Sequence, residues 1–385
     1  MKNKSILLCT LLLASTPVAA KTWQLNGYAS QGYVNVEDSQ FIVGDKGDTF
    51  KASELGLAGS WSPWEHFRFA GAVNYRQFGN LADDDVEFDY LFAEYSYPVF
   101  ENSTLGLRLG RTKNELGFYS STRDVPFGRP SIMLPQSIYS DYFRDSQLHV
   151  DGGDLFGKHI LFDGVFEWHA TIGQLGVTDQ FTENVLGSSE LGKFDSEEYY
   201  AVDLDYQGDY LHLGLTYYKA AIGFHTANNN TYRDGKISVE SVVGSIQYRY
   251  NWFEITAEYS FVDNGFKGIE LASATDTSQY DSQGYYIDLR FYLPENVELF
   301  IRYDDHIANK DYPDGGNKPW GPYYGYTHDW TFGSRWTFAD DWMLAAEYHQ
   351  IEGASWVAPV AAPNPMTQAK DWSIFLMQLS YRFQW

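Results

Sequence analysis

The chain has 385 residues, of which 18% are aromatic, with 34 glycines and a formal net charge of −24 at pH 7. This acidity argues against a nucleic-acid partner, because binding to a phosphate backbone depends on clustered lysine and arginine. Nothing after residue 20 approaches the roughly 18 consecutive apolar residues that a membrane-spanning helix needs. The aromatic and glycine content instead suits a barrel with an apolar outside and a polar lumen, or a secreted all-β protein.

The first 20 residues predict a signal peptide. Lys2 and Lys4 precede the apolar run at 6–13, and Ala20 ends a stretch of small residues, so we expect cleavage near Ala20. Cys9 is the only cysteine and lies in this segment. The exported chain, residues 21–385, therefore has no disulfide, thiol catalyst or thiolate metal site to offer, and we expect it to form one barrel domain.

From Trp23 onward the apolar residues recur with period 2, which predicts strands with two different faces. In the strand expected at 197–207, for example, Val202 and Leu204 share one face while Asp203 and Asp205 share the other. The pattern predicts sixteen strands, at 23–36, 50–62, 67–78, 86–97, 103–113, 146–156, 159–174, 197–207, 210–224, 237–250, 252–263, 281–293, 297–307, 326–338, 342–353 and 370–385.

Short and long connections alternate between these strands. Pro63-Trp64-Glu65, Gly157-Lys158 and Pro294-Glu295-Asn296 are among the seven tight turns expected, and eight longer loops separate them. Outer-membrane barrels have this alternation, with short periplasmic turns and long extracellular loops. The sequence therefore predicts an all-β fold, a 16-stranded antiparallel transmembrane β-barrel. Sixteen strands enclose too much volume for side chains to fill, so the apolar face should meet lipid.

The longest interruption of the strand pattern runs from Asn114 to Ser146 and is the third of the long loops. It combines three prolines with charged residues and ten aliphatic or aromatic side chains, a composition that argues against disorder. Loops longer than about 15 residues are usually functional when they are ordered. We expect this segment to fold into the lumen and narrow it.

The last expected strand alternates apolar residues from Phe375 to the terminal Trp385. This resembles the C-terminal signature of outer-membrane proteins that the barrel-assembly machinery recognises. Together with the strand number, the leader and the alternating loops, it resembles a Gram-negative porin over the whole mature chain. An ordinary edge strand that ends in tryptophan is the alternative interpretation of this ending.

The porin resemblance implies an outer-membrane channel for passive diffusion of ions and small hydrophilic solutes. In that family the third extracellular loop, here 114–146, constricts the lumen. The resemblance also implies contact with lipid and lipopolysaccharide, and a homotrimer. Gly110-Arg111-Thr112-Lys113 resembles the way phosphate-selective porins leave their fifth strand, so a substrate-selective anion channel is the alternative.

Arginines concentrate between residues 68 and 144 of this otherwise acidic chain. Opposed charges at a constriction create a transverse field that passes small polar solutes, and a locally basic constriction is one hypothesis. The other is that the arginines pair with neighbouring acids and hold the loop to the wall. The residues expected at the constriction are Arg68, Arg76, Arg108, Arg111, Lys113, Glu115, Arg123, Asp124 and Arg129.

An outer-membrane enzyme is the rival class. The histidines are scattered, and neither G-x-S-x-G nor H-E-x-x-H occurs, so no catalytic residues are expected. The acidic stretches 83–85 and 311–317 lack the spaced ligands and terminal glutamate of a calcium loop, so no metal or cofactor is expected either.

Overall fold

The computed structural model describes residues 23–82, 86–227, 232–269, 277–316, 318, 320–357 and 367–384. The expected signal peptide, the triplet at 83–85, residue 317 and Trp385 lie outside this part. The strands are β1 (Trp23–Glu37), β2 (Asp48–Thr49), β3 (Ala52–Trp64), β4 (Phe67–Phe78), β5 (Val86–Phe100), β6 (Ser103–Lys113), β7 (His149–Leu161), β8 (Gly164–Leu175), β9 (Gly192–Gln207), β10 (Leu211–Thr226), β11 (Gly235–Tyr250), β12 (Phe253–Lys267), β13 (Thr277–Leu293), β14 (Val297–Ile307), β15 (Tyr326–Ala339), β16 (Trp342–Gly353) and β17 (Asp371–Gln384). The helices are α1 (Arg144–Leu148), α2 (Asp179–Leu186) and five short 3₁₀ segments, η1 (Gly44–Lys46), η2 (Ser120–Thr122), η3 (Ser189–Leu191), η4 (Pro294–Asn296) and η5 (Pro322–Gly325).

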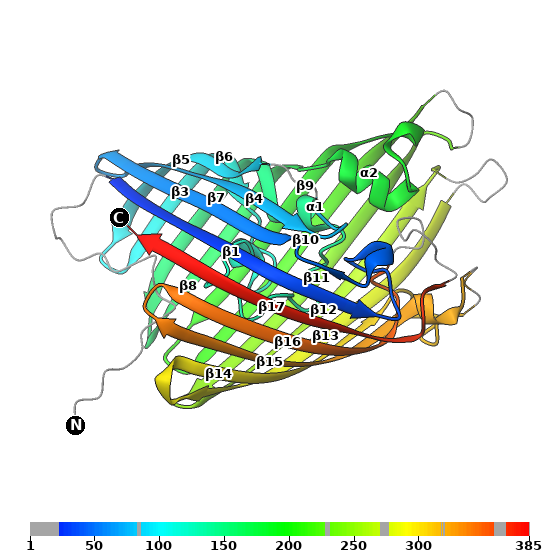
Figure 1. The fold of residues 1–385 in the computed structure, drawn as a ribbon. Helices are drawn as coiled ribbons and strands as arrows, with labels where there is room; N and C mark the ends of the chain where they lie inside the picture. The colour runs from blue at the N-terminus through cyan, green and yellow to red at the C-terminus, as the bar shows by residue number, and fades with distance from the viewer. Residues whose placement is uncertain are drawn as a thin grey trace.

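The strands form one antiparallel sheet that closes on itself (Figure 1). β1 pairs with β17 from Asn26 opposite Gln384 to Glu37 opposite Ser373. Every other long strand pairs with its neighbours in chain order, and β2 adds only a two-residue pairing to β1. The sixteen long strands therefore make a closed barrel, which confirms the predicted fold class and strand number.

The two ends of the barrel differ (Figure 1). At one end, called the turn end below, short turns join the strands, and β1 begins and β17 ends there. The long connections, including α2, lie at the other end, called the loop end. Within the described part of the chain, no helix is long and apolar enough to cross a membrane.

One predicted turn was wrong. Gly157-Lys158 lies inside β7 and pairs with β8, and the turn falls at Phe162-Asp163 instead. A Cβ at Gly157 would come within 2.3 Å of the Trp168 ring, so this glycine admits a close aromatic contact rather than a chain reversal. Strand β7 also begins later than predicted, at His149 rather than at 146, because residues 144–148 form α1.

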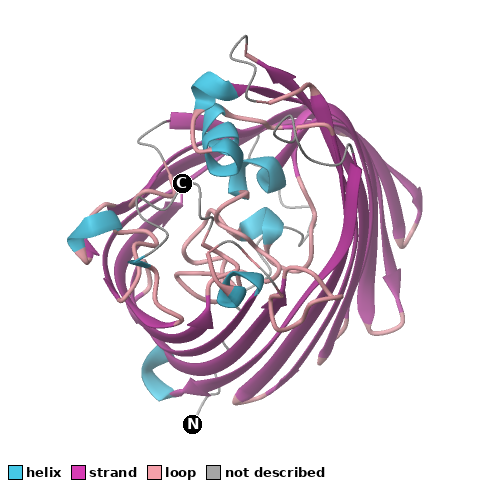
Figure 2. Cartoon of the chain, turned by 90° about the vertical axis from the view of Figure 1, so that its right-hand side faces the viewer, coloured by secondary structure: helices cyan, strands magenta, loops and turns pink. Residues whose placement is uncertain are grey.

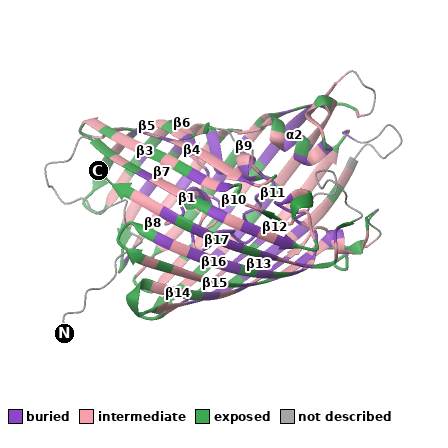
Figure 3. Cartoon of the chain, viewed as in Figure 1, coloured by how far each residue is buried: buried purple, intermediate pink, exposed green. Residues whose placement is uncertain are grey.

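Exposed and buried residues alternate along the strands of the barrel wall (Figure 3). On β10, the apolar side chains of Leu213, Leu215 and Tyr217 are exposed, whereas Thr216 between them is 1% exposed. On β17, Phe375, Met377 and Leu379 are exposed and Ser380 is fully buried. An apolar outer face of this kind is what a lipid bilayer requires of a membrane-spanning barrel.

The inner wall at the loop end carries an apolar cluster, called the loop core below. Ile374 and Leu376 of β17 are buried there, while their outward neighbours Phe375 and Met377 are exposed. Residues of several long connections pack onto this wall and onto one another. The loop core includes Val34, Val36, Phe41, Ile42, Val43, Phe78, Leu81, Ile132, Met133, Tyr142, Tyr324, Ile351, Trp356, Val357, Trp372, Ile374 and Leu376.

Helix α2 covers a second apolar cluster at the same end. Phe181 and Leu186 pack against Phe194 of β9, Phe224 of β10 and Ile237 of β11. Thr178 caps this helix by accepting a hydrogen bond from the Phe181 amide, and Gly187 ends it in a left-handed conformation. The loop core and the cluster under α2 thus cover two parts of the inner wall at the loop end.

Candidate pore constriction

The long connection between β6 and β7, residues 114–148, crosses the interior of the barrel. The end-on view shows loops and short helices across the lumen (Figure 2). Near its start, the Asn114 side chain accepts a hydrogen bond from Tyr199 of β9, and the Gly117 amide donates to Thr216 of β10. Farther along, Arg129 reaches Glu54 of β3 and Gln378 of β17. This connection, called the crossing loop below, therefore bonds to strands on opposite sides of the barrel.

Wall carboxylates accept hydrogen bonds from the backbone amides of the crossing loop. Glu347 of β16 accepts from the amides of Ile132 and Met133, the second at 3.2 Å. Asp304 of β14 accepts from the amide of Gln136 at 2.8 Å. Glu258 of β12 accepts from the Phe118 amide at 2.9 Å and the Tyr139 hydroxyl at 2.5 Å. Buried amides need such partners, so these carboxylates stabilise one backbone path for the loop.

Wall arginines complement the carboxylates by donating to carbonyl oxygens of the crossing loop. Arg290 of β13 donates to the Pro130 carbonyl at 2.8 Å. Arg302 of β14 donates to the Ser131 hydroxyl at 2.9 Å and to the Met133 carbonyl at 3.0 Å. Sequence reasoning did not include Arg290 or Arg302 among the constriction residues. The signal that could have identified them is the alternation of polar and apolar residues, which puts both arginines on the polar faces of their strands.

Five of the expected constriction residues come together in one buried charge cluster. Arg129 binds Glu54 through both carboxylate oxygens, at 2.9 and 2.7 Å. Arg76 binds Asp141 at 2.9 Å and lies 3.5 Å from Glu54. The cations of this charge cluster are Arg76, Lys113, Arg123, Arg129 and Arg144, and its anions are Glu54, Asp89, Asp124 and Asp141.

The two loop carboxylates of the charge cluster stay ionised despite burial. Burial alone would raise the pKa of Asp141, but Arg76, Arg123 and Arg144 outweigh it and hold this pKa at about 2. Burial opposes ionisation of Asp124 in the same way, and Lys113 and Arg144 lower its pKa well below the usual range. These charges are bound to one another and join the crossing loop to the barrel wall.

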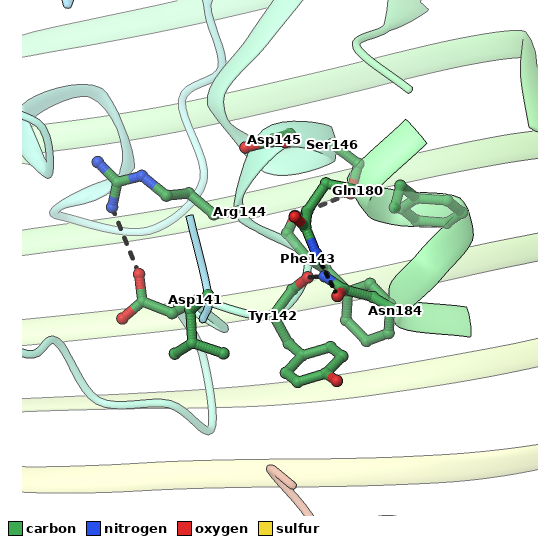
Figure 4. A pocket seen from close by; sticks show the side chains of 10 residues that line it. Asp141, Tyr142, Phe143, Arg144, Asp145, Ser146, Gln180 and Asn184 are labelled. Atoms are coloured by element: carbon green, nitrogen blue, oxygen red, sulfur yellow. Dashed lines mark hydrogen bonds and ion pairs between the residues drawn. The ribbon is translucent and has the colours of Figure 1, made fainter. Parts of the chain in front are cut away.

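A small cavity adjoins the charge cluster where the crossing loop meets α2 (Figure 4). Its volume is about 10 Å³, room for about one water molecule. The Arg144 and Asp141 side chains lie 3.5 Å apart beside it, and the Asn184 side chain donates to the Tyr142 carbonyl at 2.6 Å. The contact between the loop and α2 is therefore packed.

Arg68 and Arg108 lie elsewhere on the inner wall, nearer the turn end than the charge cluster, in a part called the uncovered wall below. Arg68 donates to Glu94 at 2.7 Å, and Arg108 binds Glu94 at 2.9 Å and Asp154 at 3.3 Å. Among the described residues, no hydrogen bond or ion pair joins these four side chains to residues 114–148. A solute that crosses the barrel beside the loop would meet this wall.

The last two expected constriction residues stand apart. Arg111 binds Asp151 at 2.7 and 2.8 Å and the Phe88 carbonyl at 3.1 Å. It shares a strand face with Leu107 and Leu109, which are exposed on the outside, so it does not join the lumen clusters. Glu115 is half-buried and forms no hydrogen bond or ion pair with any residue that the structure describes.

No protein-family model and no curated protein sequence matches the chain. Solved structures do match its fold, among them OmpT of Vibrio cholerae in a trimer form, with 11% identity and a TM-score of 0.56. An anion-selective porin from Comamonas acidovorans has 11% identity and a TM-score of 0.55, and OmpF of Salmonella typhi in complex with daunomycin has 14% and 0.56. Each match covers 94% of this chain, and 99%, 99% and 97% of the respective structure. The chain thus has the 16-stranded barrel fold of outer-membrane porins.

Proposed function

We propose that this protein is a non-enzymatic channel of the Gram-negative outer membrane, through which ions and small hydrophilic solutes diffuse passively. The observation that carries the proposal is the closed sixteen-strand barrel with an apolar outer face and a polar inner wall crossed by one long loop. A solute passes between the crossing loop and the wall of β7 and β8, where lumen side chains are partly exposed.

The pairing of the arginines supports the hypothesis that they hold the loop rather than select anions. Arg123 and Arg129 are 1% and 4% exposed and bound to loop and wall partners. On the uncovered wall, Glu94 and Asp154 compensate Arg68 and Arg108, and Glu115 adds an unpaired carboxylate. This charge arrangement favours weak cation selectivity over a phosphate-type anion channel.

The proposed location in the outer membrane also implies which molecules the protein contacts. The outer face of the barrel would contact lipid and lipopolysaccharide, and the alternating apolar side chains of β17 would present the assembly signal that ends in Trp385. A homotrimer is part of this proposal. Chemical cross-linking of the refolded protein in detergent, followed by electrophoresis, should give a product three times the monomer mass.

Planar lipid bilayers test the channel directly. Refolded residues 21–385 should insert in discrete current steps, and a KCl gradient should give a reversal potential with a modest preference for K⁺. Glu115→Gln should reduce this preference because it removes the unpaired carboxylate. A preference for Cl⁻ would contradict the charge assignment, and the absence of current steps from protein that has folded would contradict the proposed function.

A further inference from the structure

Aromatic rings and arginines alternate along the uncovered inner wall. The Arg108 guanidinium lies 4.4 Å from the ring centroid of Phe156 and 5.4 Å from that of Phe92. The Arg68 guanidinium lies 5.6 Å from the same Phe92 centroid. These four residues come from four adjacent strands, β4 to β7, and are called the aromatic–arginine stripe below.

The wall is built to hold these rings flat against it. A Cβ at Gly106 would approach the Phe156 ring to 2.2 Å, so only glycine leaves room for the ring on the neighbouring strand. All four members of the stripe are partly exposed, with the side chains of Arg68 and Arg108 at 29% and 21%. The stripe thus presents ring and guanidinium surfaces to the lumen without protruding far into it.

The stripe has hydrogen-bonding capacity but little net charge. Arg108 uses Nε for Glu94 and Nη1 for Asp154, which leaves Nη2 without a partner among the residues that the structure describes. The two carboxylates match the two arginines in number, so an ion gains little by binding here. On the loop side, Glu115 lies near enough to act electrostatically on Arg108 and His169, and its carboxylate is free to accept hydrogen bonds.

A solute between the wall and the loop therefore meets the ring faces of Phe92 and Phe156. It also meets a free donor, Nη2 of Arg108, and a free acceptor, the Glu115 carboxylate. Ring-shaped solutes that carry hydroxyl groups satisfy all three, because their C–H faces pack on aromatic rings while their hydroxyls both donate and accept. We propose that the aromatic–arginine stripe, with Glu115 opposite, is a binding site for neutral, hydroxyl-rich ring solutes with the chemistry of pyranose sugars. This inference rests on the proposed channel function and names the solute class for it.

Single-channel recording with maltose tests the site. In the unaltered protein, maltose should reduce the ion current along a saturating curve, because bound sugar blocks the path. Phe156→Ala and Phe92→Leu should each weaken the apparent affinity about fivefold through loss of ring contact. Phe88→Ala is the matched control, since Phe88 lies on the same strand as Phe92 but is 58% exposed on the outer face, and its maltose response should be unchanged.

Two results would overturn the proposal while leaving the channel function intact. One is a current that conducts ions normally but falls with maltose only in proportion to solution viscosity. The other is a stronger block by benzoate than by maltose, which would assign the stripe to aromatic anions. If Phe156→Ala does not refold, Phe92→Leu alone decides the outcome, because this smaller change retains an apolar side chain at the wall.

Discussion

Glu54 shows at the scale of single residues how the barrel holds a buried loop. It binds Arg129 through both oxygens, lies 3.5 Å from Arg76, and accepts hydrogen bonds from Ser30 and Gln378. Its neighbours Arg76 and Arg129 have only buried partners to offset their charge. Removing one partner of a buried ion pair is costly because the other charge is left uncompensated.

Glu54→Gln is therefore expected to destabilise the folded protein by about 3–5 kcal/mol. Urea unfolding of the refolded protein in detergent, followed by tryptophan fluorescence, measures this loss. Glu101→Gln is the control, because Glu101 is exposed in the turn after β5. Equal unfolding midpoints for Glu54→Gln and the unaltered protein would show that the charge cluster does not hold the loop.

The pKa of Asp141 gives a pH signature of the same cluster. Its pKa in the folded protein is about 2, below the value of about 3.9 for a free aspartate. A depressed carboxyl pKa contributes stability above the free value, and this contribution is lost as the pH falls through the folded value. The stability difference between the unaltered protein and Asp141→Asn should thus be full above about pH 4 and shrink toward pH 2. Urea unfolding at several pH values checks this, and a difference that does not depend on pH would contradict it.

The crossing loop is the element that links the fold to the channel. Its path is set by wall carboxylates that accept from its amides and wall arginines that donate to its carbonyls. These contacts reach β12, β13, β14 and β16, far from the strands that the loop connects. Loss of one contact should loosen a short segment without unfolding the barrel, because the sheet itself closes between β1 and β17.

Glu347→Gln tests this view of the loop. The substitution leaves one side-chain oxygen for the two amides of Ile132 and Met133 and a weaker acceptor in place of a carboxylate. We expect the barrel to refold and the open-channel current to become noisier, as residues 131–133 fluctuate in the lumen. Glu352→Gln is the control, since the Glu352 side chain is 46% exposed and pairs with Lys370 near the loop end. Identical current noise in both variants would rule out Glu347 as a restraint on the loop.

Two sequence patterns predicted the barrel. The period-2 alternation follows from strand geometry, and the alternation of short and long connections follows from the two membrane interfaces. The same reasoning misplaced a turn at Gly157-Lys158, since glycine marks a tight ring contact and a reversal equally well. It also singled out Arg123 and Arg129 on the loop, but it could not name their partners. Arg129 meets Glu54, 75 positions away in the sequence, and only the closed barrel brings the two together.

At the scale of the whole molecule, the loop core packs at the loop end, and the charge cluster ties the crossing loop to β3, β4, β5 and β6. The aromatic–arginine stripe lies on β4 to β7, nearer the turn end than the charge cluster. Ser380 of β17 is fully buried on the inner wall next to Gln378, which binds the loop. Thr171 of β8 is partly exposed beside Asp154 on the uncovered wall. These two residues therefore report on opposite sides of the expected solute path.

Cysteine labelling during single-channel recording tests this path most directly. Residues 21–385 contain no cysteine, so Thr171→Cys and Ser380→Cys can each be challenged with a charged, thiol-specific methanethiosulfonate reagent. The current through Thr171→Cys should fall in a lasting step upon labelling, while Ser380→Cys should keep its full current. A lasting block of Ser380→Cys together with an unaffected Thr171→Cys would show that solutes cross on the other side of the loop.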